Sequence, residues 1–382
     1  MVFIFLFLCN LCFSQMKVLY RVPYPRFFSQ HKAVGGHVAH SIGVIRGFVE
    51  KGHKVTVMAH EGREPYEKAG AEFEEVPGRG GGPLRRQLWL RRFFCRSKQL
   101  LSQQAFDLTY TRYSASAAPW LWWALAREEI SSILEINSLG SQRLSVLGPL
   151  DAQVIQACSV PIVVSETLKR WIGQVLGSGV ASKLKVVQNG VGEARFRPVA
   201  EERSEETFRC AFAGLIKPHY GLKDLIDAAR LLPESDFSFH IFGAGPFMSE
   251  LKSYASDVGN AILEGEIPFG EVPDRLRQMD CLVYTTSSDR IYQSPTKLFE
   301  YMAIGRPIVA ARTPQTEEIL LGGKLGRLFE LEDSDALAKT VREVQSSYDA
   351  ALKRARKAQC VAQRQHSWKA RVQDIIKALP DS

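Results

Sequence analysis

Short apolar runs alternate along most of the chain with segments in which apolar residues recur at helical spacing. The first run, 18–22, precedes a glycine-containing loop, and Val38, Ile42 and Ile45 then follow three or four positions apart. The next run, HKVTVMA at 53–59, has the length and the β-branched content of a strand. Together these segments predict a strand–helix–strand unit near the start of the chain.

The same alternation continues to about residue 190. Strand-like runs occur at DLTYTRY, SSILEIN, PIVVS and LKVVQNG, and helix-compatible segments separate them. Strands connected in this way lie parallel in one sheet that helices cover on both faces. We therefore expect residues 16–195 to form an N-terminal Rossmann-like domain.

A polar stretch, RPVAEERSEET, then interrupts the pattern and is typical of a linker. The alternation resumes with the apolar runs RCAFAGL, FSFHIFG, AILEGEI, DCLVYTT and RPIVAAR, between which GLKDLIDAARLL and VPDRLRQM have helical spacing. We expect a second doubly wound α/β domain at 208–360, and a last helix within 361–382 that packs on this domain or returns to the first. Because ligands of such domains bind at the carboxyl ends of the strands, two facing domains imply a cleft between them.

The composition is that of a globular protein, since 45% of the 382 residues are hydrophobic and 24% are charged. This balance excludes a disordered chain. The net charge of +8 suits phosphorylated small molecules, an anionic membrane surface or nucleic acid, and does not choose among them. The seven cysteines are scattered, so we expect a reduced, cytoplasmic protein without a metal site.

The first fifteen residues, MVFIFLFLCNLCFSQ, form an apolar leader. The leader has the length of a signal peptide but lacks a basic start, and it is too short to span a bilayer as a helix. The sequence MKVLYRV that follows it has the pattern of a first strand. We favour a mis-assigned start at Met16, with a membrane anchor or an export signal as the alternative.

The segment SPTKLFEYMAIGRPIVA, which begins at Ser294, carries two opposite charges on a short apolar helix. Ser294 suits the N-cap and Pro295 the first helical position, while Gly305 ends the helix. Lys297 then lies in the first turn, and Glu300 follows on the same face. One interpretation is a surface ion pair. The other is a diphosphate site, in which the lysine and the free amides bind phosphates and the carboxylate binds ribose hydroxyls.

This segment resembles the signature of the family 4 retaining glycosyltransferases, in particular the subgroup with the pattern S-P-x-K-x-x-E-Y-M-A-x-G. Further stretches follow in the order of that family: GGHVAHSIGVIRGFVEKGHKVTV, VVQNGVGEARFRP, GLIKPHYGLKDLIDA, IFGAGP and EVPDRLRQMDCLVYTT. The resemblance covers nearly all of the chain from Met16. It implies the GT-B fold, in which two Rossmann-like domains face each other across a cleft.

The resemblance also assigns roles to residues. Glu300 would bind the ribose of a nucleoside diphosphate sugar, and Lys297 with the amide of Thr296 would face the phosphates. Lys217 lies in a loop with the pattern K-P-x-x-G and would be a second phosphate cation. The residues expected to act in catalysis are Lys217, Lys297, Glu300 and Asn137. Those expected to bind substrate are Gly35, Gly36, Arg112, Glu135, Gly214, Pro218, Gly243, Gly245, Tyr292, Ser294, Pro295 and Thr296.

The second domain departs from the family pattern at several positions. Many relatives have an arginine and a lysine where this chain has Leu215 and Tyr220, so neither charge is present. Many also have a glutamate where this chain has Tyr292, and Asp289 is the candidate to replace its contact with the donor sugar.

A further departure concerns the first domain, where Asn137 stands in the place of a histidine that many relatives have. An amide cannot act as a general base, but it can donate and accept hydrogen bonds. Glu135 and Arg112 lie at the ends of neighbouring predicted strands, and we expect them to complete this wall of the site. A strand-end turn or a buried polar pair is the alternative for each.

We therefore predict a hexosyltransferase that retains the anomeric configuration and acts on a glycan or a lipid-linked acceptor in polysaccharide biosynthesis. UDP and GDP sugars both remain candidate donors. Because the departing phosphate can accept the proton of the acceptor, the scheme needs no metal ion and no cofactor. The alternatives are a nucleotide-sugar epimerase of the same fold and a non-catalytic protein that binds a nucleotide sugar or a glycan.

Residues 83–98, PLRRQLWLRRFFCRSK, predict a helix rich in arginine and aromatic residues. Such a helix can lie on an anionic membrane surface with its apolar side in the interface. Alternatively, its apolar side packs on the core and its charges are solvated. We expect a cytoplasmic protein that is free or membrane-associated, and no nucleic acid partner, because no recognisable module accompanies the charge.

Overall fold

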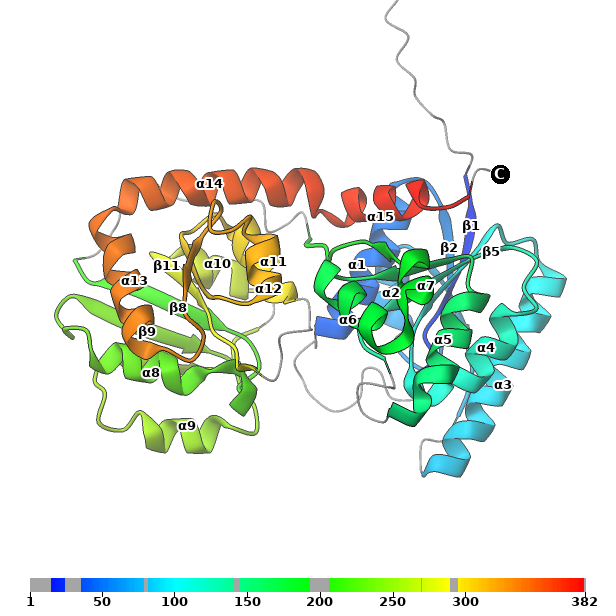
Figure 1. Cartoon of the computed structure of the whole chain (residues 1–382), viewed down its shortest axis with the longest axis horizontal. Coiled ribbons are helices and arrows are strands. Elements are labelled where there is room, and N and C mark those ends of the chain that lie inside the picture. The colour runs from blue at the N-terminus through cyan, green and yellow to red at the C-terminus, as the bar shows by residue number, and fades with distance from the viewer. Residues whose placement is uncertain are drawn as a thin grey trace, which may run out of the picture.

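The computed structural model describes residues 15–24, 36–78, 82–139, 145–192, 206–268, 270–288 and 295–380. Within these ranges the chain forms two α/β domains, each built on a parallel sheet (Figure 1). The expected fold class of two doubly wound domains is therefore confirmed. Gly35, Tyr292 and Ser294, together with Asp289, lie outside the described residues.

The first sheet has seven described strands in the order β3-β2-β1-β4-β5-β6-β7, and all of its pairs are parallel. The strands are β1 (Lys17–Arg21), β2 (Lys54–Ala59), β3 (Glu72–Glu75), β4 (Leu108–Arg112), β5 (Ser131–Ile136), β6 (Val160–Val163) and β7 (Lys185–Val186). The helices of this domain are α1 (Gly36–Glu50), α2 (Arg63–Lys68), α3 (Pro83–Gln103), α4 (Ala118–Leu125), α5 (Gly148–Ala157), α6 (Glu166–Leu176) and α7 (Ser178–Lys183). Short 3-10 turns lie at Ala115–Ala117 and Ser145–Leu147.

Alternate strand positions divide the core of the first domain into two layers. Leu19 and Leu134 face one layer, which α3, α4, α5 and α6 cover. Val18 and Ile133 face the other, which α1 and α2 cover together with a helix from the C-terminus of the chain. The near-continuous apolar runs in the sequence follow from this burial on both faces.

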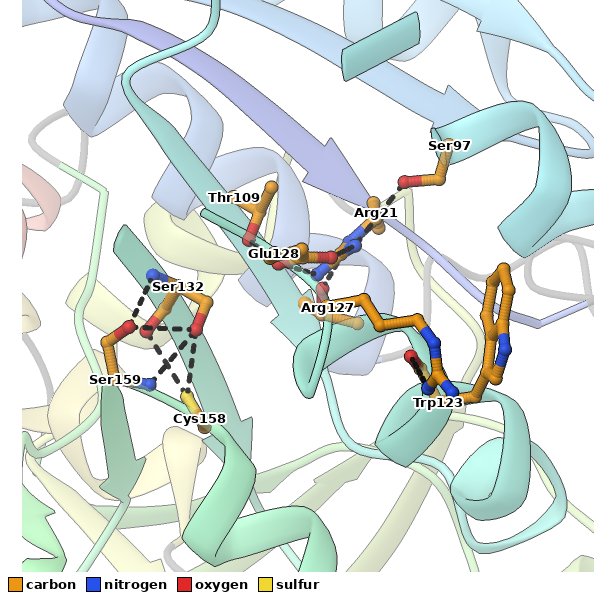
Figure 2. A network of polar contacts seen from close by, with 10 residues as sticks. Arg21, Ser97, Thr109, Trp123, Arg127, Glu128, Ser132, Cys158 and Ser159 are labelled. Atoms are coloured by element: carbon orange, nitrogen blue, oxygen red, sulfur yellow. Dashed lines mark hydrogen bonds and ion pairs between the residues drawn. The ribbon is translucent and has the colours of Figure 1, made fainter. Parts of the chain in front are cut away.

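A buried ion pair joins the first strand to the loop that leads into β5. Arg21 in β1 is fully buried and pairs with Glu128 (Figure 2). The same guanidinium donates to the hydroxyls of Thr111 (2.6 Å) and Ser97 (3.3 Å), and Glu128 accepts a hydrogen bond of 2.7 Å from Thr109. The network thus ties β1 and β4 to α3 beneath the sheet.

The second sheet has six described strands in the order β10-β9-β8-β11-β12-β13. The strands are β8 (Phe208–Ala213), β9 (Phe237–Phe242), β10 (Ala261–Gly265), β11 (Cys281–Tyr284), β12 (Ile308–Ala311) and β13 (Arg327–Phe329). The helices are α8 (Leu222–Arg230), α9 (Met248–Tyr254), α10 (Val272–Arg277), α11 (Thr296–Ile304), α12 (Pro314–Ile319), α13 (Ser334–Ser346) and α14 (Tyr348–Gln365), with a 3-10 turn η5 (Pro218–Tyr220). The helices α8, α9 and α13 cover one face of the sheet, and α10, α11, α12 and α14 contribute to the core on the other.

The chain returns to the first domain at its C-terminus (Figure 1). Helix α14 ends at Gln365, and α15 (Trp368–Lys377) packs its apolar side on α1. Trp368 lies so close to α1 that a Cβ atom added at Gly43 would come within 2.0 Å of its ring. The chain passes between the domains once after Val191 and again before Ser367, and a parallel β-bridge joins these two residues.

Candidate functional site

The charged pair of the apolar segment that begins at Ser294 lies on α11. This helix begins at Thr296 and Pro295 is its N-cap, so the expectation that Pro295 is the first helical residue is wrong by one position. Gly305 ends the helix in the left-handed conformation, as expected. Lys297 is in the first turn and Glu300, which is half-buried, lies one turn later.

The Lys297 ammonium occupies an unusual environment for a lysine. Its Nζ atom is buried and has no hydrogen-bond partner among the described residues. It lies 3.5 Å from the centroid of the Phe212 ring and 4.6 Å from that of Tyr220. Burial lowers the pKa of Lys297 to about 7, and the nearby Glu300 carboxylate only partly offsets this effect. A surface ion pair between Lys297 and Glu300 therefore does not describe this site.

Three glycines allow the loops after β8 and β9 to pack backbone against backbone. A Cβ atom at Gly243 would lie 1.8 Å from the carbonyl oxygen of Gly214, and one at Gly245 would lie 2.2 Å from that of Ile216. A Cβ atom at Gly214 would lie 2.4 Å from Nζ of Lys297. The GAGP sequence thus serves close packing beside the lysine, and larger residues would displace both loops.

The loop after β8 also carries the second predicted phosphate cation. Lys217 is half-buried and precedes η5, in which Pro218 is exposed. The hydroxyl of Thr285 donates to the carbonyl of Tyr220 (2.6 Å), and the hydroxyl of Ser287 donates to the carbonyl of His219 (3.1 Å). These bonds attach the loop to the residues after β11, at the carboxyl edge of the sheet.

In the first domain the predicted wall residues converge on one buried carboxylate. Glu135, at the end of β5, accepts a hydrogen bond of 2.7 Å from Nδ2 of Asn137 and lies 3.5 Å from Nε of Arg112. His40 Nε2 is 2.7 Å from Glu135, and Arg371 on α15 is 3.1 Å away. The hydroxyl of Tyr110 also donates a hydrogen bond to the Glu135 carboxylate.

These contacts set the charges of the cluster. Burial alone would raise the pKa of Glu135, but His40, Arg371 and Arg112 together hold it well below its usual range. Burial lowers the pKa of His40 to about 4, so its ring is neutral at pH 7 and acts as a hydrogen-bond partner. Because a carboxylate can only accept, the Asn137 amide must turn its NH₂ group toward Glu135.

Sequence reasoning missed His40 and Arg371. His40 lies between the apolar positions of a predicted helix, and Arg371 follows Glu135 by more than two hundred residues. The only signal for His40 was a polar residue among the apolar positions of a predicted helix, and Arg371 had no such signal.

Two family models match consecutive parts of the chain. The model described as Glycosyltransferase Family 4 matches residues 34–195, and the model described as Glycosyl transferases group 1 matches residues 207–347. The chain belongs to the family 4 glycosyltransferases. The first match contains Asn137, and the second contains Lys217 and Lys297.

Two named relatives are similar to this glycosyltransferase over most of its length, and a third over about half of it. The phosphatidyl-myo-inositol mannosyltransferase of Mycolicibacterium smegmatis is 25% identical over 82% of this chain and 81% of that protein. A GDP-mannose-dependent α-(1-6)-phosphatidylinositol monomannoside mannosyltransferase of the same organism is 24% identical over 78% of this chain and 82% of its own length. An uncharacterised glycosyltransferase of Methanocaldococcus jannaschii is 24% identical, but its match spans only 48% of that protein.

Solved structures share the fold. Anabaena HepE in complex with UDP superimposes with a TM-score of 0.76 at 17% identity, over 95% of this chain and 99% of that one. Sucrose-phosphate synthase from Thermosynechococcus elongatus superimposes with a TM-score of 0.75 at 14% identity, over 95% of this chain and 98% of that one. At these identities the likeness shows the GT-B arrangement of the glycosyltransferase.

The two domains of the glycosyltransferase also touch through α12. Glu318 accepts a hydrogen bond of 2.6 Å from the Gln188 side chain and one of 3.5 Å from the amide of Glu166, at the start of α6. A separate contact attaches α15 to the end of the first domain. Arg371 donates a hydrogen bond of 2.9 Å to the carbonyl of Val187, just before the chain leaves that domain.

Helix α3 of the glycosyltransferase packs its aromatic residues inward. Trp89, Phe93 and Phe94 are buried in the core, whereas Leu84 and Leu88 are 74% and 53% exposed. Of the two interpretations of this helix, the one in which its apolar side packs on the core is therefore confirmed, and its aromatic side is not available to a membrane. None of the helices in the described ranges is long and apolar enough to cross a bilayer.

Proposed function

We propose that this glycosyltransferase moves a hexosyl unit from a nucleoside diphosphate sugar to a glycan or lipid-linked acceptor and retains the anomeric configuration. The observation that carries the proposal is the buried Nζ of Lys297, which has no hydrogen-bond partner in the described part of the chain. A buried ammonium without an anion is costly. A diphosphate would supply the anion, and the amides at the N-terminus of α11 would add donors.

If the diphosphate lies beside Lys297, neighbouring residues of the second domain would contact the rest of the nucleotide sugar. Glu300 would accept hydrogen bonds from the ribose, and Lys217 would approach the diphosphate from the loop after β8. Gly214, Gly243 and Gly245 would contribute by letting the loops after β8 and β9 pack closely together beside the bound nucleotide. Gly35, Gly36, Tyr292, Ser294, Pro295 and Thr296 remain proposed donor contacts.

The S-P-x-K-x-x-E-Y-M-A subgroup is part of this proposal. In support of it, the hydroxyl of Tyr301 accepts a hydrogen bond of 3.0 Å from the amide of Ala213. This bond fixes α11 to the end of β8, so Lys297 and the loop that carries Lys217 keep one relative position.

The transfer itself exchanges one bond for another on the same face of the sugar. The bond between the anomeric carbon and the β-phosphate oxygen breaks, and a bond from the acceptor oxygen forms. The proton of the acceptor hydroxyl goes to the departing phosphate oxygen. The protein's part is to hold the diphosphate and neutralise its developing charge, which Lys217 and Lys297 would do without a metal ion.

The acceptor would meet the first domain. Because Glu135 holds the NH₂ group of Asn137, the amide oxygen points away from the carboxylate and can accept a hydrogen bond from an acceptor hydroxyl. Asn137 would thus orient the acceptor rather than remove its proton. Arg112 and Glu135 would support this wall.

We propose a lipid-linked acceptor at the cytoplasmic face of a membrane. In support, the names of the two Mycolicibacterium relatives specify phosphatidylinositol lipids. The outer face of α3 combines exposed Leu84 and Leu88 with exposed arginines, and this helix has no acidic residue in its sequence. Such a face suits the surface of an anionic membrane, without insertion of the buried aromatic residues.

The test is nucleotide release from a panel of UDP and GDP sugars by the chain from Met16, with and without a membrane extract. Release that needs one donor and increases with extract is the expected result. Retention is tested by determining the anomeric configuration of the product by NMR. Epimerised donor without extract would favour the epimerase, and tight donor binding without release would favour a non-catalytic binding protein.

A further inference from the structure

The groups around the Lys297 ammonium are aromatic rather than acidic. Its Nζ lies over the faces of Phe212 on β8 and Tyr220 in η5, at 3.5 and 4.6 Å from their centroids. The backbone of Gly214 lies directly beside it. In the described ranges, no carboxylate forms an ion pair with this atom, and no oxygen accepts a hydrogen bond from it.

Ring faces and carboxylates affect an incoming anion in different ways. A carboxylate partner would repel a diphosphate and would have to be displaced before the lysine could bind it. An aromatic face attracts a cation through its quadrupole but carries no net charge. The lysine can therefore stay on the rings and still direct its N–H groups at a phosphate.

We propose that Phe212 and Tyr220 are positioning residues of the donor site, whose ring faces hold the cationic form of Lys297 against Gly214 until the donor phosphates bind it. The inference rests on the proposed function, because it takes the donor diphosphate as the anion. It assigns a role to two residues outside the predicted site.

The charge state of Lys297 provides a readout for this arrangement. With a pKa of about 7 in the free protein, the lysine is protonated well below pH 7 and neutral well above it. The titratable groups on the elements around it are Glu300 and Tyr301 on α11, Arg209 and Cys210 on β8, Cys281 and Tyr284 on β11, and Lys217, His219 and Tyr220 in the loop after β8. A bound diphosphate favours the charged form, so donor binding takes up a proton and weakens as pH rises above 7.

Isothermal titration calorimetry in buffers of different ionisation enthalpy measures this uptake. We expect that whichever of UDP-glucose and GDP-mannose binds will take up about half a proton at pH 7, almost none at pH 6 and nearly one at pH 8. Neither phosphate of these donors titrates in this range, so the uptake reports on the protein. Lys297→Arg, which stays charged, should bind the donor without uptake. Donor binding by wild type without proton uptake at pH 8 would overturn the inference.

A matched pair of variants tests the rings. Tyr220→Phe keeps the ring and should keep the pH dependence of donor affinity. Tyr220→Leu keeps the apolar bulk but removes the ring face, so the fall in affinity should begin about half a pH unit lower. Equal profiles for the two variants would contradict a role for the ring. If wild type binds and transfers a sugar but shows neither effect, only this inference fails, whereas absence of binding to every nucleotide sugar would overturn the proposed function as well.

Discussion

At the scale of single residues, the Glu135 carboxylate connects four separate parts of the chain. His40 comes from α1, Tyr110 from β4, Asn137 from the loop after β5 and Arg371 from α15. The carboxylate therefore orients the proposed acceptor contact and at the same time fixes the C-terminal helix to the first domain. Removal of its charge would take away the carboxylate that pairs with the buried Arg371 guanidinium.

Glu135→Gln should reduce the free energy of unfolding by about 3 kcal/mol, because a buried arginine loses its anionic partner. The measurement is urea unfolding at pH 7.5. Glu250→Gln is the matched control, since Glu250 is an exposed partner of Lys223 and its loss should change stability by less than about 0.5 kcal/mol. Equal effects of the two substitutions would show that the buried cluster does not stabilise the fold.

The sequence indicated part of this cluster but not its organisation. Asn137 was predicted from its place in the family pattern, and Arg112 and Glu135 were predicted because parallel strands place their carboxyl ends at one edge of a sheet. His40 and Arg371 were not, because their role depends on helices packing over the sheet from distant parts of the chain. Likewise Lys297 was predicted from the motif, but its burial against Phe212 was not, since no local pattern reports which side chains surround an atom.

At the scale of elements, the apolar runs predicted most strands because both sheets are covered on both faces. The strand β3 was missed, since its sequence EFEE has one apolar residue and lies at the edge of the sheet. The strand β13 was missed because its three residues are too few to show a pattern. For α3 the pattern predicted the helix, but its imperfect apolar stripe did not decide which side faces the core.

The outer face of α3 yields a prediction about membranes. Replacing Arg85, Arg86, Arg91 and Arg92 by glutamate should reduce binding to vesicles rich in anionic lipid by more than tenfold, because each cation near such a surface contributes on the order of 1 kcal/mol. Co-sedimentation with vesicles measures this. The matched control replaces Lys339, Arg342, Lys353 and Lys357, on helices of the second domain, by glutamate. Loss of binding to the same extent in both variants would assign the attraction to net charge alone.

At the scale of the whole molecule, two buried histidines tie stability to pH. Burial lowers the pKa of His40 on α1 and of His366 between α14 and α15 to about 4 each. The unfolded chain binds protons at these rings below about pH 6.5, whereas the folded chain does not. Stability is therefore fully present above this pH and is lost as pH falls toward 4.

Between pH 7 and pH 5 the free energy of unfolding should fall by about 2 kcal/mol for each of these histidines. Urea unfolding at both pH values measures the change for wild type and for the His40→Gln and His366→Gln variants. Each substitution should make the fall in unfolding free energy between pH 7 and pH 5 smaller by about 2 kcal/mol, independently of its effect on stability at pH 7. A loss of unchanged size in the double variant would mean that other groups cause the acid sensitivity.

The two-domain architecture was predictable because the alternation of strands and helices stops at a polar linker and then starts again. The return of the chain to the first domain was left open, since the apolar face of the last helix suits either domain. The structure resolves this through Trp368, which packs against Gly43, and through Arg371, which reaches Glu135. Such contacts depend on how the surfaces of α15 and the first domain fit together, which the sequence pattern of either segment alone does not show.

The central claim is that Lys297 stabilises the departing diphosphate during sugar transfer. Its most direct test is kcat for nucleotide release by Lys297→Ala, with the donor and acceptor found for wild type. We expect a loss of about 100-fold or more, the scale of removing one stabilising donor from a transition state. Lys223→Ala, which removes an exposed lysine of the same domain, should stay within about twofold. A Lys297→Ala enzyme with a kcat similar to that of Lys223→Ala would contradict the account.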